Sequence, residues 1–284
     1  MSDKTRQKSD DFFAIPGVSI LALSGRDAVA FAQAQFMNDV SALAPGHWQW
    51  NGWLTPKGRV IALFALLRTG DESLLLALLD ADAEGFAARL QRYVFRSKVG
   101  ITARPDLHAT GRLAPPARAT RARFDDTGDG IELDAGSATH PRTLRIGAPG
   151  ADDATGALEW LRLDLAHGLP RLPPAQSEQW TPQQLSLDRL KAYSVRKGCY
   201  PGQEIVARTH FLGQAKRGLA RLSGGGLAPT ARVVAGADGR EIGEVVCAAA
   251  GEGLAVMPLD AGAGPFLVAG SPATPLPLLD GLAR

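Results

Sequence analysis

The sequence predicts an α+β protein whose chain ends in a small antiparallel β-barrel or sandwich. In residues 18–103, strand-like apolar runs alternate with helix-like segments, an order that favours an α+β layer over a doubly wound fold. Beyond Phe211–Gly213 the texture changes to short strand-like runs separated by Gly, Asp and Pro, which is typical of a small antiparallel barrel. We therefore expect two domains, residues 1–210 and 211–284. The short runs cover 219–222, 233–234, 241–247 and 253–257.

The composition is that of an ordinary globular protein with a hydrophobic core. The chain has 284 residues, of which 45% are hydrophobic and 21% are charged, far from the composition of disordered chains. Its net charge is +2, with Lys, Arg, Asp and Glu interleaved. This balance provides no electrostatic basis for an extended nucleic-acid-binding surface, so direct binding of nucleic acid is not expected.

Cysteine usage and the amino terminus predict a cytoplasmic protein. Cys199 and Cys247 do not form a CxxC pair, which argues against a disulfide framework and fits a reducing compartment. The polar segment Met1–Asp11 lacks the apolar core of a secretory signal or anchor. The longest apolar runs, Val60–Leu67 and Leu74–Leu79, are too short to span a bilayer, so no membrane contact is expected.

The amino-terminal part is predicted to alternate strands and helices. A strand over 18–23 precedes a helix that Asp27 caps and that the pair Asn38-Asp39 closes, because apolar residues recur between them at helical spacing. A turn over 55–58 follows. The next elements are strands over 60–67 and 74–79, a helix over 83–95 and a strand over 99–103.

Three tryptophans, Trp48, Trp50 and Trp53, gather just before the turn over 55–58. Clustered tryptophans are more often found packing in a core or at a sheet edge, and this is the interpretation that we favour. Their flat rings could instead stack on a heterocyclic ligand. The sequence alone leaves this alternative open.

The middle of the chain gives weaker signals. Residues 105–150 are rich in Ala, Arg, Pro and Gly, with strand-like runs only at 121–124 and 143–146. Residues 152–166 are predicted to form a helix that ends at His167-Gly168, before a proline. His167 is therefore interpreted as a capping or surface residue, with catalysis as the alternative. A further helix-like run covers 185–192.

The segment Lys197–Glu204 carries the densest chemistry of the chain. Cys199 follows one glycine closely and precedes another, and glycine permits tight turns and close backbone approach. The ammonium group of Lys197 would favour the reactive thiolate. The alternative is that Cys199 is a small buried side chain.

Other polar residues near this segment have two interpretations each. Glu204 either accepts hydrogen bonds from a ligand or caps a helix. Arg208, Lys216 and Arg217 either form a solvated face or recognise a carboxylated ligand, since guanidinium groups pair with carboxylates in a bidentate manner. His210 is the nearest candidate base for Cys199, although Cys–His chemistry needs a base folded against the thiol.

Several classes of site find no support in the sequence. The histidines lack the paired spacing of zinc ligands, so no metal site within the chain is expected. There is no GxGxxG in a βαβ unit and no GxxxxGK[ST], which leaves nucleotide binding by those loops unsupported. The five histidines are at positions 47, 108, 140, 167 and 210.

The run Lys197–Glu204, followed by Val206–Arg208, resembles the signature of the YgfZ group of folate-binding proteins, relatives of the glycine-cleavage T protein. The match is specific and extends over about residues 20 to 220. The other matching blocks are Leu23–Asp27, Asn38–Val40, Pro56–Arg59, Pro182–Gln184, Leu187-Asp188 and Gly213–Arg217.

The resemblance implies a T-protein-like multi-domain body around a central opening that binds tetrahydrofolate, followed by the small barrel. It also implies a protein that supports assembly or repair of iron-sulfur clusters, including those of tRNA-modifying enzymes. The partners would be folate and iron-sulfur client enzymes or cluster carriers. The catalytic candidates are Cys199, Lys197, Gln203 and Glu204, and the cofactor-binding candidates are Trp160, Tyr200, Arg208 and Arg217.

The same resemblance leaves enzymatic activity open. T proteins carry Arg-x-Glu-x-Gly where this chain has Asp164-Leu-Ala166-His-Gly168. Alanine offers no acceptor for the N–H groups of a pterin, so aminomethyl transfer is placed in doubt. An accessory role is therefore the leading hypothesis. The alternatives are a tetrahydrofolate-dependent aminomethyl or methyl transferase and a scaffold without a ligand.

Overall fold

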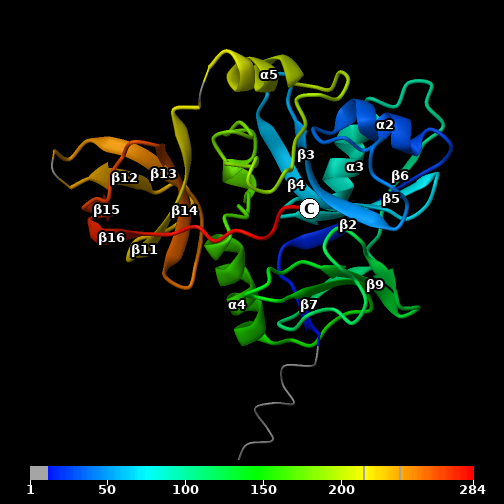
Figure 1. Cartoon of the computed structure of the whole chain (residues 1–284), viewed down its shortest axis with the longest axis horizontal. Coiled ribbons are helices and arrows are strands. Elements are labelled where there is room, and N and C mark those ends of the chain that lie inside the picture. Colours follow the sequence, from blue (N-terminus) through cyan, green and yellow to red (C-terminus); the bar gives the residue numbers. More distant parts are fainter. Residues whose placement is uncertain (1–11, 214, 237) are drawn as a thin grey trace, which may run out of the picture.

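The computed structural model describes residues 12–213, 215–236 and 238–284. It contains two five-stranded sheets, a closed barrel of six strands and helices that pack between and around them (Figure 1). The segment Met1–Asp11, which we expect to carry no signal or anchor, lies outside the described residues. No helix in the described ranges is long and apolar enough to cross a membrane.

The first sheet has the order β3-β4-β5-β2-β6 and is antiparallel throughout. Successive residues of β4 alternate between two hydrophobic clusters, with Leu63 in one and Phe64 in the other, so both faces of the sheet are buried. This explains the unbroken apolar runs of the central strands. The bounds are β2 Val18–Ser24, β3 His47–Leu54, β4 Val60–Arg68, β5 Ser73–Leu79 and β6 Gly100–Ala103.

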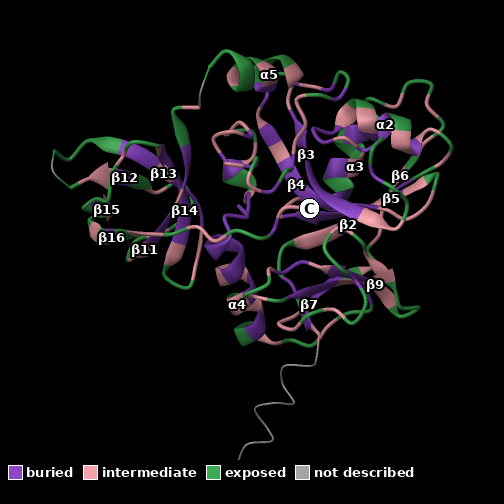
Figure 2. Ribbon diagram, viewed as in Figure 1, coloured by how far each residue is buried: buried purple, intermediate pink, exposed green. Residues whose placement is uncertain are grey.

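The strands expected in this region are confirmed, and the tryptophan cluster is itself part of a strand. Trp48, Trp50 and Trp53 all lie in β3 and are at most 5% exposed. Trp48 and Trp50 pack edge to face at 5.2 Å. Figure 2 shows β3 and β4 almost entirely buried at the centre of the molecule. The packing interpretation of the tryptophans is therefore confirmed.

Both helices of the amino-terminal part are shorter than predicted. Helix α2 spans Ala28–Gln35, because Phe36 turns to an extended conformation and packs edge to face on Phe64 at 4.9 Å. Asp27 does not cap α2 through its side chain, which instead accepts a hydrogen bond from the backbone N–H of Lys98. Helix α3 spans Ala83–Gln91 rather than reaching residue 95.

The second sheet, β1-β7-β10-β9-β8, occupies the region of weak sequence signal. The expected strand over 143–146 is confirmed as β10. The one over 121–124 is wrong, because the segment makes a turn held by bridges between Thr120 and Arg123 and between His47 and Arg123. The bounds are β1 Phe13–Ala14, β7 His108–Arg112, β8 Asp125–Asp126, β9 Gly130–Asp134 and β10 Thr143–Gly147.

Helix α4, Ala154–Ala166, lies between the two sheets and the barrel (Figure 1). The side chain of Asp153 caps it, and it ends at Gly168, whose φ of +68° favours glycine. The N–H of His167 donates to the carbonyl of Leu163. The prediction that His167 caps the helix is confirmed. The alternative of a surface position is wrong, because His167 is only 2% exposed.

The connector after α4 leads to the motif segment. The prediction of a helix over 185–192 is wrong. This run is a series of turns in which Ser186 and Lys191 have positive φ values of 48° and 54°, incompatible with a continuous helix. A short 3₁₀ turn, η1, covers Pro174–Gln176, and α5 covers Gln203–Phe211.

The predicted barrel is confirmed. Six antiparallel strands close in the order β11-β14-β13-β12-β15-β16 around their own apolar cluster. Closure leaves no unpaired sheet edge. The bounds are β11 Arg217–Gly224, β12 Arg232–Ala235, β13 Glu241–Ala249, β14 Glu252–Pro258, β15 Phe266–Val268 and β16 Ser271–Leu276.

After β16 the chain leaves the barrel and returns to the centre of the body, where Figure 1 marks its end. The N–H of Leu279 donates to the carbonyl of Ala166 at 2.8 Å, at the end of α4. The indole N–H of Trp50 donates to the carbonyl of Leu282 at 2.8 Å. The barrel is thus connected to the body through both of its ends. The division into domains at residue 210 stays a prediction.

Candidate functional site

The motif loop presents Cys199 to solvent between two buried neighbours. The thiol is free and exposed, whereas Lys197 and Tyr200 are each 6% exposed. The alternative of a small buried cysteine is therefore wrong. Among the hydrogen bonds of the described residues, none involves the Cys199 sulfur. His210, on the exposed side of α5, packs against Phe211 with their ring centres 4.9 Å apart, and no hydrogen bond among the described residues joins it to the thiol.

Lys197 attaches the motif loop to the end of helix α2. Its ammonium group also lies 4.8 Å from the centre of the Tyr200 ring. A cation at a helix carboxyl end is favourable. Burial lowers the pKa of Lys197 to about 8, an effect that the carboxylate of Asp39 opposes. The carbonyl oxygens that accept hydrogen bonds from Lys197 Nζ belong to Gln33, Phe36 and Asn38.

Two further side chains hold the loop from within. The hydroxyl of Tyr200 donates to the carbonyl of Ser194 at 3.1 Å, and burial raises the pKa of Tyr200. Gln203 Nε2 donates to the carbonyl of Lys197 at 3.1 Å. The loop is therefore a rigid frame around a single exposed thiol. Lys197 and Gln203 hold this loop in place through their hydrogen bonds, and their catalytic role stays a prediction.

Gly202 joins two of the sequence blocks that are distant along the chain. It has a φ of +79°, and a Cβ atom there would lie 2.6 Å from the Cα of Gly58 and 2.6 Å from the carbonyl oxygen of Thr55. Only glycine combines this backbone conformation with such a close approach. A third block joins them, since Gln183 Nε2 donates to the carbonyl of Val206 at 2.9 Å.

The remaining polar candidates near the motif face solvent. Glu204 lies exposed in the first turn of α5. A negative charge at the amino end of a helix is favourable because it interacts with the helix dipole. Arg208 is exposed in the last turn of the same helix. Arg217 opens β11 and donates to the carbonyl of Ile242 at 2.8 Å. Their roles toward a ligand stay predictions.

Trp160 lies elsewhere, on α4 at a small enclosed cavity in the centre of the body. Its ring is 5% exposed and packs edge to face on Phe13 at 6.2 Å. The cavity has a volume of about 20 Å³, enough for roughly one water. It is lined by Ile15, Val18, Trp50, Ala65, Ala77, Leu79, Ala135, Arg142, Leu144, Trp160, Asp164 and Leu169.

A buried ion pair borders this cavity. Arg142 is 1% exposed, and its Nη1 donates to Asp164 Oδ1 at 2.8 Å. The guanidinium carbon lies 4.5 Å from the centre of the Trp160 ring, a cation–π contact. Arg142 Nε has no hydrogen-bond partner among the described residues. A guanidinium, a carboxylate and an indole therefore meet at one wall of the cavity.

Asp164 is also shared with a second arginine. Arg171 Nη1 lies 3.5 Å from Asp164 Oδ2, and Arg171 pairs with both oxygens of Asp80 at 2.6 and 2.9 Å. Two cations and two carboxylates thus form one compensated network. Sequence reasoning missed Arg142 and Arg171 because their partners lie 22 and 91 residues away along the chain.

The chemistry of the cavity wall suits a flat heterocycle with polar edges, but its volume does not. A pterin ring needs far more than the space of one water, so it does not fit the cavity in this structure. Ala166 is buried, and its side chain offers no hydrogen-bond acceptor. Among the described residues, no cluster of three or more His, Cys, Asp or Glu could hold a metal.

Comparisons with known proteins agree on one family and one fold. No family model matches the chain. A tRNA-modifying protein YgfZ of Klebsiella pneumoniae (strain 342) is 32% identical, over 72% of this chain and 69% of that protein. The protein of the same name from Vibrio vulnificus (strain YJ016) is 28% identical, over 74% and 69%.

A solved structure has the same fold. The glycine cleavage system aminomethyltransferase T from Bartonella henselae superposes with a TM-score of 0.70 and covers 93% of this chain and 84% of its own. Its sequence is only 14% identical, so the likeness concerns the fold alone. The predicted T-protein-like body with a carboxyl-terminal barrel is confirmed.

The Gly202 contact yields a first prediction. Gly202→Ala should lower the free energy of unfolding by about 2 kcal/mol or more, because the new side chain meets both a left-handed backbone and two backbone atoms. Gly198→Ala is the matched control, since a Cβ atom there meets nothing within 4 Å. Urea denaturation of both variants measures the difference. Equal losses would show that the contact is not tight.

The buried His167 yields a second prediction, on pH. Burial, followed by Arg142 and His140, lowers its pKa from 6.5 to about 4. Between these values the unfolded chain binds more protons than the folded one, so the free energy of unfolding falls as the pH drops from 6.5 to 4. For each pH unit that the pH falls in this window, the free energy of unfolding of the wild type should decrease by roughly 1 kcal/mol relative to that of His167→Gln.

Urea denaturation at a series of pH values measures this difference. His108→Gln is the control, because His108 is an exposed histidine on β7. Its stability should follow that of the wild type throughout. If His167→Gln shows the same pH dependence as the wild type, His167 does not titrate as its burial requires.

Proposed function

Because this chain belongs to the YgfZ family of tRNA-modifying proteins, we propose that it is a tetrahydrofolate-binding accessory protein that supports iron-sulfur clusters in client enzymes. Assembly or repair of clusters in tRNA-modifying enzymes is the specific role. Cys199 is the thiol through which it acts. The observation that supports this proposal most is that Cys199 is exposed on a loop held in place by Lys197, Tyr200 and Gln203.

The geometry of this thiol favours a role toward a partner. The described residues supply no metal cluster and place no base against Cys199. A lone thiolate is a nucleophile and a metal ligand, so a solvent-facing one can meet a cluster or electrophile carried by another molecule. A fixed loop limits the entropy lost when such a contact forms.

The central cavity supports the folate part of the proposal. Trp160 and Arg142 combine an aromatic face with a hydrogen-bond donor, groups that can recognise a pterin ring. Arg142 Nε is buried and unpartnered among the described residues, which leaves one donor for an entering molecule. Binding of a pterin ring here requires the wall to open, because the cavity has a volume of only about 20 Å³.

The second candidate function is tetrahydrofolate-dependent aminomethyl or methyl transfer, favoured by the shared T-protein fold. Two local features weigh against it. Ala166 has no acceptor, and Asp164 is already occupied by two arginines. Turnover of a methylated amine in the presence of tetrahydrofolate would support the transferase. Folate binding without turnover would support the accessory role.

Folate binding can be measured as a thermal shift. Tetrahydrofolate under reducing conditions should raise the Tm of the wild type, because a ligand that binds the folded state stabilises it. Trp160→Phe should reduce this shift while keeping an aromatic side chain against Phe13. Trp180→Phe is the control, since Trp180 bonds to Gln176 away from the cavity. No shift in the wild type would contradict folate binding.

The role of the thiol can be measured by complementation. In a bacterial strain lacking its own YgfZ protein, the wild-type chain should restore thiomethylated tRNA nucleosides, quantified by mass spectrometry. Cys199→Ala should restore no more than background. Cys247→Ala is the control, because Cys247 is buried and burial raises its pKa to about 12. Equal rescue by Cys199→Ala and wild type would remove the thiol from the mechanism.

A further inference from the structure

A second hollow lies behind the wall of the central cavity and has no part in the proposed function. Its volume is about 640 Å³, within the range of small-molecule sites. Ala135 and Arg142 line the central cavity, and their neighbours Asp134, Gly136 and Pro141 line this cleft. The lining residues are Pro115, Pro116, Ala119, Thr120, Arg121, Asp134, Gly136, Ser137, Ala138, Pro141, Gly281 and Arg284.

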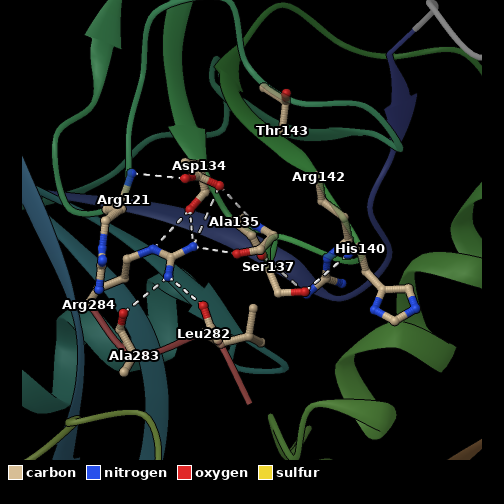
Figure 3. Close-up of polar contacts among 12 residues, drawn as sticks. Arg121, Asp134, Ala135, Ser137, His140, Arg142, Thr143, Leu282, Ala283 and Arg284 are labelled. Atoms are coloured by element: carbon tan, nitrogen blue, oxygen red, sulfur yellow. Dashed lines mark hydrogen bonds and ion pairs between the residues drawn. The ribbon is translucent and has the colours of Figure 1, made fainter. Parts of the chain in front are cut away.

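Arg284 is one of the residues that line this cleft, and Figure 3 shows the polar contacts that hold its side chain. Its side chain is 3% exposed and pairs with Asp134 Oδ1 at 3.6 Å. Its nitrogens donate to backbone carbonyls on both sides, including Asp134 at 2.6 Å and Gly136 at 2.6 Å. The guanidinium also lies 5.4 Å from the Trp48 ring. Its donors are used, so it acts on the cleft through its charge.

Arg121 supplies the available cation. Its φ of +51° is uncommon for a residue other than glycine, and two contacts hold it. The backbone N–H donates to Asp134 Oδ2 at 2.9 Å, and the carbonyl accepts from Trp48 Nε1 at 2.9 Å. The side chain is exposed and has no ion pair among the described residues. Backbone strain of this kind is found at ligand sites more often than elsewhere.

The charges of the side chains that line the cleft do not balance. Burial lowers the pKa of Arg284; Asp134 opposes this effect, and the charges of Arg121 and Arg142 add to it. Among the side chains that line the cleft, Asp134 carries the one carboxylate, against the two guanidinium groups of Arg121 and Arg284. Arg142 is already compensated by Asp164. An anion beside Arg121 would relieve the remaining repulsion.

Hydroxyl groups and an apolar surface complete the cleft. Ser137 Oγ accepts from the N–H of His140 at 3.1 Å and lies 3.4 Å from His167 Nε2, so its position is fixed. Thr120, which precedes Arg121 in the sequence, lines the cleft with a second hydroxyl, and this hydroxyl donates to the carbonyl of Arg118 at 3.3 Å. Three prolines and two alanines form the remaining lining side chains. The cleft thus combines a small anion site with room for an uncharged body.

We propose that this cleft binds a small organic phosphate, with the phosphate on the guanidinium of Arg121 and the Ser137 and Thr120 hydroxyls and the apolar part against the prolines. Arginine matches phosphate in a bidentate geometry. A single cleft with one free arginine suits a mononucleotide-sized molecule rather than a nucleic-acid backbone, which needs a row of cations. The inference is independent of Cys199 and of folate.

Isothermal titration with adenosine monophosphate in buffer of low ionic strength tests the proposal. The wild type should show saturable binding, and Arg121→Gln should raise the Kd at least tenfold, as expected for the loss of a charge-assisted hydrogen bond. Arg123→Gln is the matched control. It removes the same charge from an exposed arginine two residues away that does not line the cleft, and it should leave the Kd unchanged.

Adenosine and a short oligoribonucleotide complete the experiment. Adenosine should bind much more weakly than the monophosphate, because it lacks the anion. The proposal is overturned if the wild type gives no saturable binding of the monophosphate, if Arg121→Gln and Arg123→Gln have the same Kd, or if only the oligoribonucleotide binds. Thermal melting of both variants, which keep a side chain of similar length, shows that each remains folded.

Discussion

The buried network of Arg142, Asp164, Arg171 and Asp80 is the constraint on which the body depends. It joins the second sheet, helix α4, the connector after α4 and the end of β5 at one point beside the central cavity. Arg142, Asp164 and Arg171 are buried, whereas the side chain of Asp80 is 20% exposed. Burying charges is unfavourable unless each is paired, and removal of one leaves its partner uncompensated. The network therefore fixes how these elements meet more than it adds to stability. It also determines what the cavity wall can offer to a ligand.

Much of the fold could be predicted from local patterns. The unbroken apolar strands around Phe64, the capped helix ending at Gly168 and the short barrel strands each carry their own signal. Failures occurred where tertiary contacts override local preference. Helix α2 stops early because Phe36 packs on Phe64, and the helical pattern over 185–192 is broken by left-handed residues. Of the second sheet only β10 was predicted, because the other strands are short and rich in polar residues or glycine.

The candidate site divides in the same way. The glycines and the cysteine of Lys197–Glu204 make this segment recognisable in the sequence. The structure adds the reason for Gly202, which packs closely against the backbone of Gly58. The role of Lys197 differed from the simple expectation, since its ammonium group holds the end of α2. The ion network and the phosphate cleft combine residues from distant parts of the chain, and Arg121 lies in a segment with a misleading strand pattern. No local signal could have revealed them.

The returning carboxyl-terminal segment has a consequence for how the molecule unfolds. The barrel leaves the body at the end of α5 and rejoins it where Leu279 and Leu282 bond to Ala166 and Trp50. If the barrel alone unfolded, its chain would remain a loop tied at both ends, and so would gain less conformational entropy than a free tail. Opening the barrel by itself is thereby disfavoured. The barrel encloses a hydrophobic cluster of its own, but its residues Leu219, Cys247 and Val256 also belong to the cluster of the body. This shared packing and the tied loop both favour unfolding of the two parts as one unit.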